Sequence, residues 1–144
     1  MSEAEQRESI VACARTWLRT PWHHAARVRG AGVDCVQFVN CVYHEALGTP
    51  LVDVDYTPDQ YLHHGQEVLL EYLSRLSRPV HAALPGDVVV YRFGRAMSHA
   101  GIVVRWPEII HASRPDAAVV LADGEGGYLA DRERGVYRWT GFRE

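Results

Sequence analysis

The 144-residue sequence lacks the features that mark several classes of protein. It has only three cysteines, at positions 13, 35 and 41, with no CxxC spacing, which excludes a disulfide framework and a cysteine-based metal site. No apolar run approaches the roughly 20 residues of a membrane-spanning helix, so we expect no membrane insertion. A net charge of −3 leaves no basic surface, and nucleic acid is therefore not an expected partner.

We also expect no conventional signal peptide, and the sequence shows no internal repeats, low-complexity tracts or convincing linkers. Its first residues, Met1-Ser2-Glu3-Ala4-Glu5, are polar and acidic, and we expect synthesis in the cytoplasm with reduced thiols. With 47% hydrophobic residues, the length fits one globular domain over residues 1–144.

The hydrophobic pattern places helices before residue 80 and strands after it. A first helix follows the Ser2–Glu5 capping box and ends at Thr20-Pro21, a second runs from about Asp34 to Leu47 before Gly48, and a third follows Thr57-Pro58. Strands are expected over 88–93, 98–104, 108–112, 117–121 and 135–142. This order predicts an α+β fold, with the helices packed on an antiparallel sheet of about five strands.

Cys35 stands where a glycine-bearing loop becomes the second helix. Asp34 is a suitable N-cap, which would put Cys35 at the first helical position. Free N–H groups and the helix dipole favour a thiolate there. We therefore expect a nucleophilic Cys35 with a lowered pKa that alkylates faster than Cys13 or Cys41. The alternative is a small apolar residue that begins a buried helix.

Two histidines follow on consecutive predicted strands. His99 begins the strand over 98–104, and His111 lies in the strand over 108–112. A hairpin centred near residue 105 would set the two residues directly opposite each other on one face of the sheet. The Cys35 helix, packed across that sheet, would bring the thiol to His99. Cysteine, base and orienting group are the parts of a thiol-dependent hydrolase; the alternative is two half-buried histidines bonded to the backbone.

These motifs resemble the NlpC/P60 family of papain-like cysteine peptidases over roughly residues 8 to 142. The matching pieces are Asp34-Cys35, Pro85-Gly86-Asp87-Val88-Val89, Ser98-His99-Ala100-Gly101-Ile102 and Ile110-His111-Ala112. The chain departs from the family pattern at Val36-Gln37, where Ser-Gly is usual, and at Trp22, where tyrosine is common. The resemblance implies a papain-like fold with Cys35 as nucleophile, His99 as base and His111 as the orienting group. It also implies hydrolysis of peptidoglycan stem peptides, often between D-glutamate and meso-diaminopimelate.

Residues near the predicted nucleophile are candidates for substrate binding. The loop over 22–33 leads into Cys35, so Trp22, His23 and Arg27 are placed to line a substrate cleft. We add Asp34 and Ser98, although Ser98 has the alternative role of capping its strand. The Cys35 N–H is the expected oxyanion donor. Adjacent His23-His24 have no second ligand cluster, and we expect neither a metal nor a cofactor.

The setting of the protein follows from resemblance alone. Thr20-Pro21, Asp34-Cys35 and Tyr56-Thr57-Pro58 resemble the cell-wall peptidases of phage tails and gene transfer agents. This implies a place in a virion or particle tail, tail-tip or baseplate partners, and action in the bacterial envelope. Tyr128, Tyr137 and Trp139 are candidates for a docking surface or for ordinary sheet packing. The competing hypotheses are a structural tail or hub component with a vestigial site, a secreted amidase toxin, and a lipid-directed thiol acyltransferase.

Overall fold

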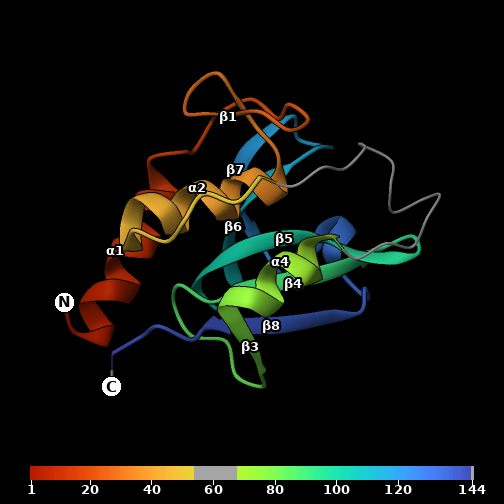
Figure 1. The fold of residues 1–144 in the computed structure, drawn as a ribbon. Helices are drawn as coiled ribbons and strands as arrows, with labels where there is room; N and C mark the ends of the chain where they lie inside the picture. Colours follow the sequence, from red (N-terminus) through yellow and green to blue (C-terminus); the bar gives the residue numbers. More distant parts are fainter. Residues whose placement is uncertain (54–67, 144) are drawn as a thin grey trace.

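The protein folds as helices laid on one face of an antiparallel sheet (Figure 1). The computed structural model describes residues 1–53 and 68–143. Within these residues the helices are α1 (Glu3–Arg15), α2 (Cys35–Leu47) and α4 (Val68–Leu76). A small hairpin of β1 (Arg27–Val28) and β2 (Gly32–Val33) precedes α2. The predicted α+β class is confirmed.

The main sheet has six strands in the order β3-β8-β4-β5-β6-β7. The strands are β3 (Ser77–Val80), β4 (Val88–Phe93), β5 (Ala96–Arg105), β6 (Glu108–Ser113), β7 (Ala118–Asp123) and β8 (Arg134–Trp139). Five correspond to the predicted strands. The sixth is β3, a short edge strand that pairs with β8 and that has no clear alternation of apolar and polar residues.

The ends of the first two helices follow their capping residues. Ser2 and Glu5 form the predicted capping box at the start of α1. The prediction that this helix continues to Thr20-Pro21 is wrong, because it ends at Arg15. The Thr16 hydroxyl bonds to the Cys13 carbonyl, and Arg19 has a positive φ of 75°, so the backbone cannot continue as an α-helix.

The helix α2 begins and ends as predicted. Asp34 is its N-cap, and Gly48 closes it in the left-handed conformation that glycine adopts without strain. The predicted start of the third helix at Thr57-Pro58 lies outside the described residues. Within the described residues, α4 coincides with the later part of the stretch predicted as the third helix, and it buries Leu69, Tyr72 and Leu73.

The two faces of the sheet have different neighbours because successive strand residues point to opposite sides. Val88, Val90, Ala100 and Ile102 pack with the helices in the larger core. The opposite face carries a smaller apolar cluster, formed by Val89, Tyr91, Val103, Ile109 and Leu129. His99 pairs with Tyr91 in the β4–β5 ladder, so His99 belongs to the face opposite the helices.

The strand β5 contains two β-bulges. Toward β4 the pairing passes from Tyr91–His99 to Arg92–Met97, which leaves Ser98 as the extra residue. Toward β6 it passes from Val103–Ile109 to Arg105–Glu108, which leaves Val104 as the extra residue.

The turn at Trp106-Pro107, later than the predicted centre near residue 105, and the bulge at Val104 together set the histidine register. His111 pairs with Gly101, so the prediction that His99 and His111 are directly opposed is wrong. They are diagonal neighbours, because His99 lies two residues from Gly101 and therefore shares its face. Without the bulge His111 would pair with Ile102, and His99 would point to the other side of the sheet.

A buried cluster of ion pairs links the N-terminal helix α1 to the C-terminal strand β8. Asp87 is fully buried and accepts bonds from Arg7 of α1 at 3.0 Å and from Arg138 of β8 at 2.9 and 3.2 Å. The Leu84 N–H donates to the same carboxylate. The cluster therefore ties α1, β4 and β8 together.

Replacing Asp87 by alanine is expected to lower the free energy of unfolding by about 3–5 kcal/mol, because Arg7 and Arg138 lose a fully buried counterion and Arg7 retains the less buried Glu3. Urea unfolding followed by circular dichroism measures this loss. Glu71→Ala is the matched control, since Glu71 and Arg75 form an exposed pair, and it should change stability little. An Asp87→Ala protein as stable as the wild type would show that the cluster is not stabilising.

The aromatic residues that were candidates for a docking surface are packed. Tyr137 packs against the helix-covered core and Tyr128 against the smaller cluster. The Trp139 ring meets the Phe142 ring edge-on at 5.2 Å. All three residues are half-buried, and a docking role for them stays a prediction. None of the described helices has the length and apolar character needed to cross a membrane.

Candidate active site

Cys35 occupies the predicted first position of α2. One Asp34 carboxylate oxygen accepts the Gln37 N–H at 2.9 Å, and the other accepts the Ala25 N–H at 2.7 Å. Asp34 therefore caps the helix and also ties the preceding loop to it. The N–H groups of Cys35 and Val36 are at the helix start, where the helix offers them no carbonyl partner. Both are directed at the Cys35 thiol.

The thiol meets β5 at the bulge residue rather than at the imidazole. Cys35 Sγ donates to the Ser98 carbonyl oxygen at 3.5 Å, and Ser98 is the extra residue of the bulge beside His99. The predicted packing of the Cys35 helix on the sheet is confirmed, but it brings the thiol to the main chain next to His99. Catalytic hydrogen bonds are often unmade until substrate binds, and this contact describes the resting state.

Burial, not the helix N-terminus, sets the acidity of this thiol. Desolvation raises the pKa of Cys35 to about 12, and the neighbouring Asp34 carboxylate acts in the same direction. The N–H groups of Ala100, Val36 and Cys35 lower the pKa by less than this. The expectation of a lowered pKa is therefore wrong. The acidity of its thiol therefore gives Cys35 no advantage in alkylation rate over Cys41. Burial raises the pKa of Cys41 to about 11.

Alkylation of Cys35 by iodoacetamide is expected to accelerate from pH 7 to 10 without a plateau. Below a pKa of about 12 the reactive thiolate fraction grows about tenfold per pH unit. Peptide mapping after timed labelling gives the rate at each cysteine, with Cys41 as the internal control. A plateau with a midpoint below pH 7 would instead reveal a thiolate–imidazolium pair in the resting protein.

His99 and His111 are joined directly. His99 Nε2 lies 2.7 Å from His111 Nδ1, and both side chains are buried. Gly101 allows this approach, because a Cβ at that position would lie 3.1 Å from the His111 Cβ. When His99 Nε2–H donates to His111 Nδ1, His99 Nδ1 is left bare and able to accept a proton.

Both imidazoles are held neutral. Burial lowers the pKa of His99 well below its usual value, with smaller contributions from His111 and Arg132. Burial also lowers the pKa of His111 to about 4, although Asp116 opposes this shift. Near pH 7 one neutral imidazole donates to the other, and in the tautomer in which His99 donates, its free Nδ1 is the base. A neutral thiol, a neutral base and a neutral orienting group form the resting site.

The model of the NlpC/P60 family matches residues 19–138, which contain Cys35, His99 and His111. The chain belongs to the NlpC/P60 family. This is a family of cysteine peptidases. Among curated proteins, none matches the chain.

Solved structures with the NlpC/P60 fold resemble the whole described domain. NlpC1 from Trichomonas vaginalis superposes with a TM-score of 0.70 at 18% identity, over 94% of this chain and 44% of that one. The NlpC/P60 domain of the peptidoglycan hydrolase SagA gives 0.61 at 23% identity, over 90% and 97%. The peptidoglycan hydrolase RipB from Mycobacterium tuberculosis gives 0.63 at 16% identity, over 94% and 65%. The chain thus spans less than half the length of NlpC1, and at these identities the likeness establishes the fold.

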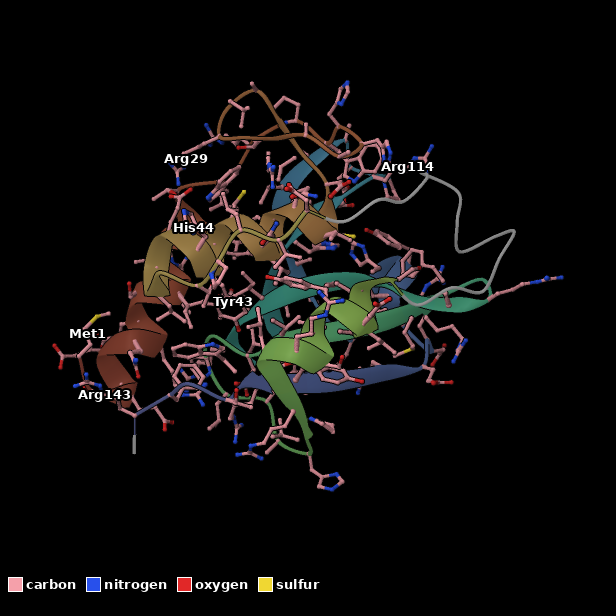
Figure 2. The ribbon with its side chains drawn as sticks, in the orientation of Figure 1. Met1, Arg29, Tyr43, His44, Arg114 and Arg143 are labelled. Carbon is pink, nitrogen blue, oxygen red and sulfur yellow. The ribbon has the colours of Figure 1, made fainter. Side chains whose placement is uncertain are left out.

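The predicted substrate-binding residues of this NlpC/P60 domain differ from one another in burial and in the groups they contact. Trp22 is half-buried, and Arg114 lies over its ring at 5.0 Å. Figure 2 shows Arg114 beside the end of α2 that carries Cys35. His23 is exposed and contacts the His24 carbonyl, whereas His24 Nδ1 lies 3.8 Å from the Asp34 carboxylate.

The other candidates are defined by main-chain contacts. Asp34 is buried and caps α2, and Ser98 offers its carbonyl to the thiol. Arg27 pairs with Asp53 at 2.7 Å. Across residues 1–53 and 68–143, no three His, Cys, Asp or Glu side chains gather as metal ligands would.

The sequence did not identify an aromatic and polar group next to the histidines. The Phe93 ring lies 5.0 Å from the His99 ring, and the Tyr128 ring lies 6.1 Å from the His111 ring. Ser113 bonds to the Tyr128 hydroxyl. Ser113 follows His111 by two residues and lies one residue past the predicted strand over 108–112, at the end of the observed β6. This two-residue spacing was the one signal that could have identified it.

Proposed function

We propose that this domain hydrolyses peptide bonds in the stem peptides of bacterial peptidoglycan. The observation that carries the proposal is the His99–His111 pair, bonded at 2.7 Å, next to the strand segment that receives the Cys35 thiol. Membership of a cysteine peptidase family supports the reaction type. Similarity to SagA and RipB, both peptidoglycan hydrolases, supports the substrate class.

In the proposed reaction the Cys35 thiol gives its proton to His99 Nδ1 as Sγ attacks the scissile carbonyl carbon. The N–H groups at the start of α2 stabilise the oxyanion that forms. Collapse breaks the C–N bond, and imidazolium His99 returns the proton to the leaving amine. Water, deprotonated by His99, then hydrolyses the thioester and regenerates the thiol. His111 accepts the Nε2–H bond throughout and stabilises the imidazolium.

Incubation with purified peptidoglycan, followed by mass spectrometry of the released fragments, tests this proposal. Cleavage within the stem should release fragments with a new carboxylate and a new amine at the broken peptide bond. Fragments cut between muramic acid and L-alanine would instead identify an amidase. A digest that matches the enzyme-free control, with folded protein, would overturn the proposed function.

We further propose that the protein acts from the tail of a phage or phage-like particle, made in the cytoplasm and active in the envelope of the target cell. The support is the resemblance of Thr20-Pro21 and Asp34-Cys35 to that group of peptidases. The third matching segment, Tyr56-Thr57-Pro58, lies outside the described residues. Attachment to a particle would raise the local concentration of a weakly binding enzyme at the wall.

Quantitative mass spectrometry of purified particles tests this setting independently of the chemistry. The protein should be present at a fixed number of copies per particle. Its presence only in culture medium or cytosol would overturn the tail proposal, whether or not the peptidase activity is found.

A further inference from the structure

Tyr128 belongs to the same aromatic group as the two histidines. It lies in the 3₁₀ turn Gly127–Leu129, anchored by a 2.7 Å bond from Arg132 Nε to the Tyr128 carbonyl. Its ring meets Phe93 edge-on at 5.9 Å and lies 6.1 Å from the His111 ring. Tyr128 and Cys35 are both partly exposed, and a thiolate at Cys35 would raise the pKa of Tyr128. The Tyr128 ring therefore lies beside the histidine pair, in a residue that is partly exposed.

The direction of the bond between Tyr128 and Ser113 follows from the other partners of Ser113. The Ser113 hydroxyl lies 2.6 Å from Asp116 Oδ2 and 2.7 Å from the Tyr128 hydroxyl. A carboxylate only accepts hydrogen bonds, so the single Ser113 proton is directed at Asp116. Ser113 must then accept from Tyr128, and it also accepts the Asp116 N–H at 3.2 Å.

This arrangement fixes the direction in which the Tyr128 hydroxyl donates its proton. The Tyr128 proton points to Ser113, and burial raises the pKa of Tyr128, so the proton is retained. Ser113 is fully buried and its bonds are all within the protein. The Tyr128 oxygen therefore offers only lone pairs to a substrate, and it is unsuited to an oxyanion hole, which needs donors.

We propose that Tyr128 is a substrate-positioning residue that accepts an amide N–H flanking the scissile bond, held in that role by Ser113 and Asp116. The inference rests on the proposed function and adds a specificity determinant to it. A peptide substrate carries an N–H in the chain on both sides of the reacting carbonyl. An acceptor beside the catalytic histidine pair fixes the peptide orientation through one of them. Substrates that lack this N–H leave a partly buried acceptor unpaired.

The test compares a synthetic stem peptide with two analogues, each N-methylated at one of the two amides next to the scissile bond. kcat/KM is measured for wild type, Tyr128→Phe, Ser113→Ala and the control Tyr137→Phe, which removes a hydroxyl on β8. Wild type and the control should favour the N–H peptide over one of the analogues. Tyr128→Phe should reduce this preference by about 2- to 12-fold, the effect of one hydrogen bond.

Comparing the preference between enzymes removes the steric effect of the methyl group, which is the same in wild type and variant. Ser113→Ala keeps the phenol but releases its proton, and should also reduce the preference. An unchanged preference in folded Tyr128→Phe would overturn the inference and leave the proposed function standing. If neither N-methylation changes kcat/KM of the wild-type enzyme, that result alone overturns the inference. Failure of wild type to cleave any stem peptide would overturn both.

Discussion

Replacing Cys35 by alanine is expected to reduce peptidoglycan hydrolysis by about 10⁴-fold or more, because no other group can form the thioester. The fold should be unaffected. Cys35 is at the first position of α2, where alanine is well tolerated, and the Asp34 cap bonds to Gln37 and Ala25 rather than to the thiol. The variant should therefore separate chemistry from structure.

Release of soluble fragments measures the activity of this variant, and thermal unfolding measures its stability. Cys13→Ala is the matched control, since Cys13 is a partly exposed cysteine of α1, and it should retain activity. A Cys35→Ala protein that unfolds at the wild-type temperature and still releases fragments would show that the thiol is not the nucleophile.

The two histidines are expected to respond unequally to substitution. His99→Ala should be as inactive as Cys35→Ala, because the thiol then has no base and the groups act as a unit. His111→Ala should cost about 10- to 150-fold, the loss of one hydrogen bond to imidazolium His99. His111→Gln should be milder than His111→Ala, because an amide oxygen can accept the His99 Nε2–H bond.

Initial rates at saturating substrate, with thermal unfolding of each variant, measure this order. His111 is buried, so a destabilised His111→Ala must be assayed below its unfolding transition. If His111→Ala is fully active while His99→Ala is inactive, the site is a dyad and His111 does not orient the base. If the two alanine variants are equally inactive although folded, His111 has a larger role than orientation.

Local sequence signals predicted those parts of the protein that local interactions determine. Asp34 before an apolar helical stripe predicted the start of α2, and Gly48 predicted its end. A turn at Leu84-Pro85-Gly86-Asp87 followed by a short apolar run predicted β4, where Val88 and Val90 face the helices. The presence of His99 and His111 on paired strands also followed, because a short turn between two strands forces antiparallel pairing.

The remaining features depend on tertiary structure. No residue pattern predicts the bulges at Ser98 and Val104. They arise because β5 pairs with both β4 and β6. The pKa of Cys35 could not be predicted from the helix start, because burial depends on β5 packing over the thiol. The bonds from Ser113 to Tyr128 and Asp116 join a strand, a turn and a loop.

The bulge at Val104 has a consequence for recognising this site in other sequences. His99 and His111 are 12 residues apart along the chain, but that interval is the sum of a turn, a paired segment and one unpaired residue. If the two histidines were 12 residues apart in a hairpin without the bulge, their side chains would point to opposite faces of the sheet. If they were 11 residues apart without the bulge, both side chains would again lie on one face. Deleting Val104 itself should therefore keep the two imidazoles on one face of the sheet. Relatives are accordingly better aligned by which face of the sheet each residue occupies than by distance along the chain.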